Sequence, residues 1–184
     1  MARTTNTTHI ALLRGINVGG KNKLPMPKLI KLFEDAGCDD VRHYIQSGNI
    51  IFTAPPQEAD QLPVELEKQI NTKFKLNVPV IIRSAKELRS AIACNPFIKR
   101  GVDESELHLV FLADMPAKQQ TAALDSGRSP GDSFIVKGAE IYLHLPSGVA
   151  RSKLTNVWFD SKLNTISTVR NWRTVLKLAE LSAA

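Results

Sequence analysis

A chain of 184 residues with 43% hydrophobic and 23% charged residues has enough apolar side chains for a packed core, which argues against a disordered protein. No apolar run approaches the roughly 18 residues that a membrane span needs, and the polar start at residues 1–9 lacks the apolar segment of a signal peptide. Two cysteines are too few for a disulfide-stapled secreted domain, so we expect a cytoplasmic protein in which Cys38 and Cys94 are buried free thiols.

The net charge of +6 is concentrated at the two ends of the chain. Residues 1–31 hold six basic and no acidic residues, and residues 151–184 hold six basic and two acidic residues. Residues 32–150 hold twelve basic and sixteen acidic residues. The basic ends form one cationic surface if the fold brings them together, and two separate solvated stretches if it does not.

The first half of the chain alternates apolar runs with helical periodicity. We expect strands at 9–16, 41–45, 49–53 and 78–83, and helices at 25–36, 62–74 and 84–92. Leu62, Leu66, Ile70 and Phe74 recur every four residues, which is typical of an amphipathic helix, and residues 84–87 form a capping box. The order β-α-β-β-α-β is that of a ferredoxin-like split βαβ unit.

The second half repeats the pattern strand, helix, hairpin, helix. We expect a strand at 107–113, a helix at 116–126, a hairpin of 134–136 with 141–145, and helices at 152–163 and from about 169. Ser167 or Thr168 is the expected cap of that last helix. The predicted fold is α+β, with two ferredoxin-like-related βαββα halves at 1–95 and 107–184, a linker at 96–106 and a C-terminal helix. Only the first half is expected to close with a strand, and no residue-level repeat is evident.

A basic, amide-rich string without acids follows the first strand. Glycine lets backbone N–H groups approach a ligand closely, and Arg and Lys give charge-assisted donors for phosphate or carboxylate. The string therefore predicts an anion-binding loop, and its candidate ligand-binding residues are Arg14, Gly15, Asn17, Gly19, Gly20, Lys21, Asn22 and Lys23. A structural glycine turn is the alternative.

The same string matches the phosphate-loop spacing G-x-x-x-x-G-K from Gly15 to Lys21. Asn22 stands where a magnesium-binding Ser or Thr is needed, and Pro25 and Pro27 move the helix start downstream. A phosphate loop runs directly into its helix, so these features argue against a nucleotide hydrolase.

A second polar cluster lies at the predicted hairpin tip, at Gln46, Ser47, Gly48 and Asn49. Ser, Gly and Asn favour turns for conformational reasons alone. In a ferredoxin-like fold, however, this hairpin lies at the sheet end where the first strand stops. We therefore expect the hairpin tip and the basic string to lie side by side.

Two further candidate segments lie near the C-terminus. The first is expected to open a helix, where free N–H groups and two cations meet, and it contributes Arg151, Ser152, Lys153, Thr155 and Asn156. The second contributes Thr168, Arg170 and Asn171, of which Arg170 and Asn171 lie off the apolar stripe of the last helix and should be available. Trp172 lies on that stripe and is predicted to be core. Capped, solvated helix starts are the alternative for both segments.

The four histidines, His9, His43, His108 and His144, lie in or beside predicted strands. None has a carboxylate or second histidine at metal-ligand spacing, and no nucleophile and base can be paired by position. The sequence therefore predicts no metal site and no cofactor, and it names no catalytic residue.

Four motifs resemble a known bacterial family, the domain of unknown function 1697. They are residues 11–21, residues 44–49, residues 151–156 and residues 168–172 with Thr174 and Lys177. The resemblance implies a two-part α+β protein with ferredoxin-like elements. It implies no activity, cofactor or catalytic residue.

Three functions remain open. The first is binding of an anionic ligand, either nucleic acid or a phosphorylated molecule; the strands lack paired aromatics, so base stacking is not expected. The second is an enzyme that acts on a small phosphorylated or carboxylate substrate. The third is a structural or protein-interaction module, in which Asn17, Gln46, Asn49 and Asn171 satisfy buried backbone groups.

Overall fold

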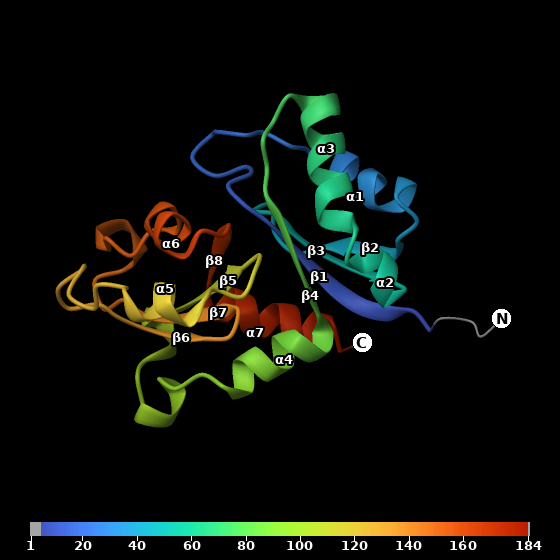
Figure 1. Cartoon of the computed structure of the whole chain (residues 1–184). Helices are drawn as coiled ribbons and strands as arrows, with labels where there is room; N and C mark the ends of the chain where they lie inside the picture. Colours follow the sequence, from blue (N-terminus) through green and yellow to red (C-terminus); the bar gives the residue numbers. More distant parts are fainter. Residues whose placement is uncertain (1–4, 184) are drawn as a thin grey trace. The chain divides into compact units, whose positions relative to one another are not determined.

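The computed structural model describes residues 5–183 and confirms the α+β class (Figure 1). The chain divides into two compact units, Met1–Arg89 with Leu178–Ala184 (unit 1) and Ser90–Lys177 (unit 2). Each unit is built on a four-stranded antiparallel sheet. Within the described residues, no helix is both long and apolar enough to cross a membrane.

Unit 1 has the predicted ferredoxin-like order. Its elements are β1 (Thr7–Leu13), α1 (Met26–Asp35), β2 (Asp39–His43), β3 (Asn49–Ala54), α2 (Pro56–Ala59), α3 (Leu62–Phe74), β4 (Val80–Ser84) and the first part of α4 (Ala85–Ala93), which enters unit 2 at Ser90. The strand order is β2-β3-β1-β4, so the central strands β1 and β3 carry the most apolar sequences. One face of the sheet packs against α1 and α3 through a cluster that includes Ala11, Phe33, Phe52 and Leu66.

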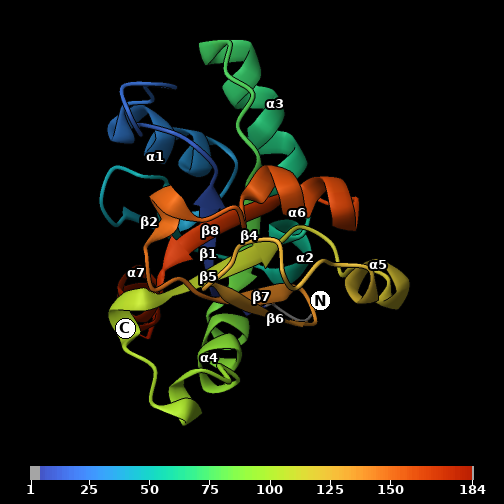
Figure 2. The ribbon, with the colours of Figure 1, turned by 90° about the vertical axis from the view of Figure 1, so that its left-hand side faces the viewer.

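Unit 2 repeats this topology (Figure 2). Its elements are η1 (Ile98–Arg100), η2 (Glu104–Glu106), β5 (Leu107–Leu112), α5 (Lys118–Ala122), β6 (Ser133–Lys137), β7 (Glu140–His144), η3 (Val149–Arg151), α6 (Asn156–Leu163), β8 (Ser167–Asn171) and the first part of α7 (Trp172–Leu181), which enters unit 1 at Leu178. The strand order β6-β7-β5-β8 matches that of unit 1, strand for strand. Val110, Ile141, Leu143 and Phe159 form the core under α6.

The last strand of unit 2 corrects the sequence-based prediction. Residues 167–171 were expected to cap and begin the last helix, but they form β8 and pair with β5. The helix α7 begins only at Trp172, and its cap is Asn171, whose Oδ1 accepts a hydrogen bond from the Thr174 N–H at 2.8 Å. The apolar residues of the last helix keep their helical spacing back into the preceding β-branched strand. The spacing alone therefore placed the start of the helix too early. Both halves are therefore complete βαββαβ units, each followed by a helix.

Strand pairing also shows a repeat that the sequence does not reveal. Opposite its final strand, β1 pairs His9 with Ser84 and Ile10 with Arg83, whereas β5 pairs His108 with Asn171 and Leu109 with Arg170. The two histidines and the two arginines thus occupy equivalent places. Ser84 and Asn171 are equivalent too, since each caps the helix that follows its strand.

Other boundaries also differ from the predictions; the first strand, expected at 9–16, spans Thr7–Leu13. The strand expected at 41–45 begins at Asp39 and ends at His43, so Asp39 and Asp40 belong to β2. The helix expected at 116–126 is shorter, because α5 spans only Lys118–Ala122. The helix expected at 152–163 begins at Asn156, after the 3₁₀ turn η3.

The two cysteines differ in environment. Cys38 is a buried free thiol, as predicted, and burial raises its pKa to about 12. Cys94 is also free but exposed, so the prediction that it is buried is wrong. It directly follows α4, whose apolar periodicity has ended by that point.

Candidate functional site

The basic string at residues 14–23 forms a compact loop between β1 and α1. Five of its residues have positive φ, a region that Gly and Asn adopt most readily: Gly15, Asn17, Gly19, Gly20 and Asn22. The loop closes on itself through the Lys21 N–H to the Val18 carbonyl (3.1 Å) and the Asn17 N–H to the Asn22 carbonyl (3.2 Å). The helix α1 begins only at Met26, so the loop lacks the direct entry into a helix that a phosphate loop has.

Asn17 holds this loop in place. Its Nδ2 donates to the Leu24 carbonyl (2.8 Å) and to the Gln46 carbonyl (2.9 Å), and its Oδ1 accepts from the Leu24 N–H (2.8 Å). Leu24 is buried, so without these bonds its backbone groups would be unsatisfied. The side chain of Asn17 is therefore fully used within the protein and is not free for a ligand.

The hairpin tip 46–49 lies against this loop, as predicted. Besides the bond from Asn17 to Gln46, the Leu13 N–H donates to the Gly48 carbonyl at 2.8 Å. A Cβ on Gly48 would lie 2.8 Å from Leu13 Cβ and 2.9 Å from Ile16 Cγ1, and the φ of Gly48 is +84°. Glycine at this position allows the two loops to touch.

Asn49 closes the hairpin from inside. It is fully buried, and its Nδ2 donates to the Tyr44 carbonyl (3.2 Å) and to Ser47 Oγ (3.3 Å). Its backbone carbonyl accepts the Tyr44 N–H at 3.0 Å. Asn49 thus has a structural role, whereas the Gln46 side chain is exposed.

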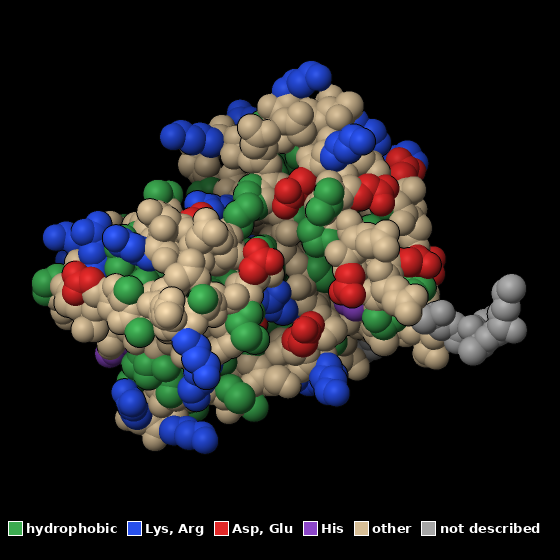
Figure 3. Space-filling view, in the orientation of Figure 1, with side chains coloured by type: hydrophobic (Ala, Val, Ile, Leu, Met, Phe, Trp, Pro, Cys, Tyr) green, Lys and Arg blue, Asp and Glu red, His purple; other side chains and the backbone are tan. Residues whose placement is uncertain are grey.

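The exposed part of the loop is basic. Lys21 and Lys23 are exposed, and within residues 5–183 neither ammonium group has a salt bridge or hydrogen bond. Gly19 and Gly20 are exposed too, and their N–H groups have no hydrogen-bond partner in the described chain. The space-filling view shows Lys or Arg side chains, and no Asp or Glu, over the tip of the loop that follows β1 (Figure 3).

A strained residue lies next to this surface. Ile45 has a φ of +50° although its side chain is β-branched, and it is 47% exposed. Left-handed backbone is a genuine outlier for such a residue, and Ile45 directly precedes Gln46, whose carbonyl Asn17 binds. Val18, the residue after Asn17, is also exposed. Strain of this kind persists only where the surrounding structure imposes it.

The helix that was predicted to begin at the start of segment 151–156 of unit 2 begins only at its last residue, Asn156. Arg151 ends the turn η3, and Thr155 caps α6 by accepting the Trp158 N–H at 3.3 Å. Ser152 Oγ accepts the Leu154 N–H, and the Lys153 N–H donates to Ser129 Oγ. The side chains of Arg151 and Lys153 are exposed, and both residues precede the cap of α6 instead of lying in its first turn.

The segment 168–171 is less accessible than predicted. Arg170 is only 9% exposed, and its guanidinium donates to Thr168 Oγ1 and to the Val169 carbonyl, each at 2.9 Å. Burial lowers the pKa of Arg170 to about 10, so the group is still charged at neutral pH. Thr168 is buried, and Asn171 is occupied as a helix cap. The prediction that Arg170 is available is therefore wrong, whereas the prediction that Trp172 is core is confirmed.

Of the twenty predicted site residues, twelve lie in unit 1 and eight in unit 2. The structure brings the two segments of unit 1 together. It also joins the two segments of unit 2, because Ser167 Oγ donates to Asn156 Oδ1 at 3.3 Å. That the two basic ends of the chain form one cationic surface stays a prediction.

One interaction that sequence reasoning missed is a hydrogen-bonded contact between a histidine and a glutamate in unit 2. His144 Nε2 lies 2.8 Å from Glu106 Oε2, and both side chains are partly exposed. The two residues are 38 positions apart, so only strand pairing could reveal them. Among the described residues, no hydroxyl or thiol is hydrogen-bonded to His144, and no cluster of metal-ligating side chains is present.

The equivalent histidines His9 and His108 are both buried, and burial is the main cause that lowers the pKa of each. His9 Nε2 lies 2.8 Å from Thr7 Oγ1. In contrast, His108 Nδ1 has no partner in the part of the chain that the structure describes. Both histidines therefore bind a proton less readily in the folded protein than in the unfolded chain.

We expect His108→Leu to flatten the dependence of stability on pH between 7.5 and 5.5. The unfolded chain binds more protons than the folded one in this range, so wild-type stability falls as the pH drops below the ordinary histidine value of about 6.5. Near pH 7.5 the variant should lie within about 1 kcal/mol of wild type, because it removes an unsatisfied ring nitrogen. The Glu106 carbonyl, which His108 also contacts, keeps its bond from the Leu145 N–H.

Urea unfolding at pH 7.5, 6.5 and 5.5 measures this slope. His43→Leu is the matched control, because it removes a histidine that is exposed on the edge strand β2, whereas His108 is buried. If the His108→Leu protein lost stability with falling pH as steeply as wild type, His108 would not be a cause of the pH dependence.

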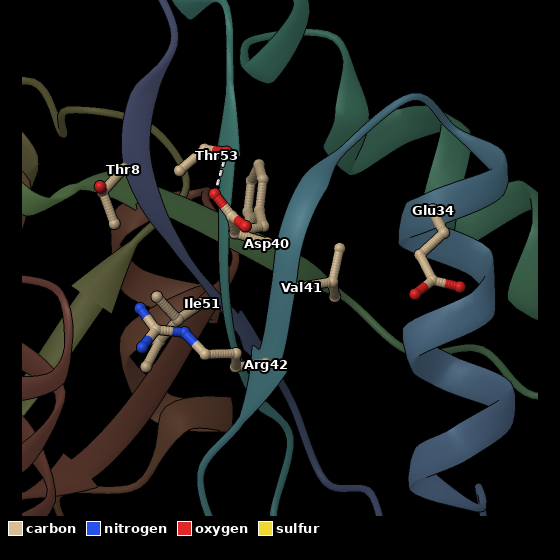
Figure 4. A pocket seen from close by; sticks show the side chains of 8 residues that line it. Thr8, Glu34, Asp40, Val41, Arg42, Ile51 and Thr53 are labelled. Atoms are coloured by element: carbon tan, nitrogen blue, oxygen red, sulfur yellow. Dashed lines mark hydrogen bonds between the residues drawn. The ribbon is translucent and has the colours of Figure 1, made fainter. Parts of the chain in front are cut away.

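A polar hollow of about 500 Å³ lies along β2, lined by Thr8, Glu34, Asp40, Val41, Arg42, Ile51, Phe52 and Thr53. Figure 4 shows Asp40 directed toward Thr53, whose hydroxyl donates to it at 3.5 Å, whereas Glu34 projects from α1. Arg42 donates to the Leu181 carbonyl at 3.1 Å. The hollow thus combines two carboxylates with a guanidinium that is already bonded, and it does not complement an anion.

Comparison with known proteins agrees with this architecture. A solved structure described as conserved bacterial protein SP0830 from Streptococcus pneumoniae aligns with a TM-score of 0.73 and 24% identity, over 97% of this chain and 99% of that one. This likeness shows a shared fold. No curated protein matches the chain. The family model for "Protein of unknown function (DUF1697)" matches residues 6–142, which include the loop after β1 and the hairpin tip. The chain therefore belongs to the DUF1697 family.

Proposed function

We propose that the loop at residues 14–23 of unit 1 binds the phosphate groups of an anionic ligand. The observation that carries the proposal is the combination of Lys21 and Lys23, which have no acidic partner in the described chain, with the exposed N–H groups of Gly19 and Gly20. Successive N–H groups in a turn, as at Gly19 and Gly20, form concave sites for anions. No acidic residue occurs between residues 5 and 33, so nothing nearby in the sequence competes for the site.

The loop is also held firmly, which favours binding over simple solvation. Asn17 and the close contact at Gly48 fix it against the hairpin tip. A preformed loop loses little conformational entropy when a ligand binds. The strained backbone at Ile45 supports the same interpretation, since strain tends to be retained at functional sites.

We expect the loop to recognise the phosphates of a ligand rather than its bases. RNA-recognition domains of similar topology stack bases on aromatic residues of an open sheet face. In unit 1 the face opposite α1 and α3 carries Ile10, Leu12 and Ile51, which are aliphatic and buried. Nucleic-acid backbones and phosphorylated small molecules both present the phosphate groups that this loop would bind. The two free thiols suit a reducing, cytoplasmic setting.

Binding of single-stranded RNA, duplex DNA and nucleoside triphosphates at 50 and 200 mM salt tests the proposal. We expect Lys21→Ala/Lys23→Ala to weaken binding at least tenfold and, for a nucleic acid, to reduce the salt slope by about 2. Lys68→Ala/Lys162→Ala removes the same charge from two other exposed lysines and should bind like wild type. If both double variants bind equally, or if the wild type binds none of the probes, the loop is not an anion site.

A second candidate is a purely structural role for the motif. It is favoured by Asn17, Asn49 and Asn171, whose side chains all bond to the backbone. In that case Lys21 and Lys23 could be replaced without any effect on binding, while replacement of the asparagines would still destabilise the fold.

A further inference from the structure

The edge strand β6 of unit 2 presents an unpaired backbone edge. It is the outermost strand of the order β6-β7-β5-β8, and all five of its residues pair with β7 on the inner side (Figure 2). The connection to β7 is a two-residue turn, Gly138–Ala139, with Gly138 at a φ of +61°. This is a regular hairpin, because a glycine with positive φ at the first turn position fits the twist of the strands.

The register of the hairpin fixes which backbone groups point outward. In a two-residue hairpin the closing pair, here Lys137 and Glu140, exchanges both hydrogen bonds, and the pattern then alternates along the strands. Ser133, Ile135 and Lys137 therefore bond to β7, and Phe134 and Val136 direct their N–H and C=O groups away from the sheet. Within residues 5–183, no strand or loop backbone bonds to those outer groups.

The equivalent edge strand of unit 1 shows how such an edge is normally blocked. The strand β2 has a register shift between Asp39 and Arg42, and Asp40 has a φ of +49°. Four of its five residues are charged or histidine. Bulges and charges are devices that prevent edge-to-edge pairing. In contrast, β6 is uninterrupted, and its three central residues are Phe134, Ile135 and Val136.

We propose that β6 pairs with β6 of a second copy of this chain, in antiparallel orientation about a two-fold axis at Ile135. The two unit 2 sheets would then form one continuous sheet. The strand is self-complementary in this register: Phe134 lies opposite Val136 of the second copy, and Ser133 lies opposite its Lys137. Aromatic–β-branched cross-strand pairs are favourable, and no like charges oppose one another.

The surroundings of β6 fit a partner strand as well. Phe134 and Trp158 are half-buried and in edge-on contact at 5.9 Å, and Arg128 lies 6.0 Å from the Trp158 ring. Trp and Arg are the residues that most often anchor interfaces.

Sedimentation equilibrium of the full chain between about 5 and 500 µM tests the proposal. A paired surface of five residues a side is smaller than a standard interface, so we expect a dissociation constant in the micromolar range. The average mass should rise from 20.3 kDa toward twice that value. Val136→Pro removes an outward N–H without breaking a bond to β7, and it should stay monomeric, whereas Val136→Thr keeps the N–H and should dimerise like wild type.

Charge variants at Ser133 give a test that is independent of the effect of proline. Ser133 is exposed, so its replacement should leave the fold intact. Ser133→Lys places two like-charge pairs across the axis and should weaken the dimer roughly threefold to tenfold, and Ser133→Glu should strengthen it by a similar factor. A wild type that stays monomeric throughout, or a dimer that is insensitive to these variants, overturns the proposal.

Discussion

Gly48→Ala is expected to destabilise the protein by roughly 3 kcal/mol or more. The left-handed backbone at this position costs about 1–2 kcal/mol for any residue with a Cβ, and overpacking adds about 1–3 kcal/mol. The Cβ would lie 2.8 Å from Leu13 Cβ and 3.0 Å from the Leu13 carbonyl oxygen. These atoms belong to the central strand β1 and cannot yield without shifting the sheet.

Gly15→Ala is the matched control. Its φ is +70°, close to that of Gly48, but a Cβ there has no atom within 4 Å. It should therefore cost only the backbone term, about 1–2 kcal/mol. Urea denaturation of both variants measures the difference. Equal losses would show that the contact between the hairpin tip and β1 contributes nothing beyond backbone strain.

Asn17→Ala is expected to cost about 3–4 kcal/mol. The change removes three side-chain hydrogen bonds, leaves the backbone groups of buried Leu24 unsatisfied, and puts alanine at a φ of +54°. Each buried polar group that loses its partner costs about 1–3 kcal/mol, and the backbone term is about 1–2 kcal/mol. The effect arises in folding and does not require a ligand.

Asn22→Ala separates these contributions. Asn22 also has left-handed backbone (φ +48°), but it is exposed, and its side chain makes a single bond, from Nδ2 to the Gly15 carbonyl at 3.0 Å. We expect a loss of about 1–2 kcal/mol, mostly from the backbone. If Asn17→Ala were no more damaging than Asn22→Ala by thermal denaturation, Asn17 would not be the anchor of the loop.

Local patterns in the sequence predicted most of the architecture. The four-residue spacing from Leu62 to Phe74 identified α3, and the capping box at Ser84 and Glu87 is formed in the structure. Such patterns survive folding because the period of a helix or strand and the chemistry of its cap are properties of adjacent residues. The order of elements then implied that the hairpin tip lies against the loop after β1, and this is confirmed.

The burial or exposure of individual side chains was predicted less well from the sequence. The sequence predicted that Arg170 is exposed and that Cys94 is buried, and the structure shows the reverse in both cases. Both errors arose because the helical spacing was extended beyond the helix itself, before the start of α7 for Arg170 and after the end of α4 for Cys94. Whether residues 167–171 form a strand depends on β5, which is about 60 residues away and offers the hydrogen bonds that a strand needs.

By itself the sequence determined the α+β class, the order of the elements in unit 1, the family and the acid-free basic loop. The tertiary structure alone decided that unit 2 closes with β8, that His9 and Arg83 are equivalent to His108 and Arg170, and that Asn17 is an anchor while Lys21 and Lys23 remain exposed. The physical reason is the range of the interactions. Periodicity and caps are local, whereas burial and hydrogen-bond partners depend on strands that meet only when the sheet forms.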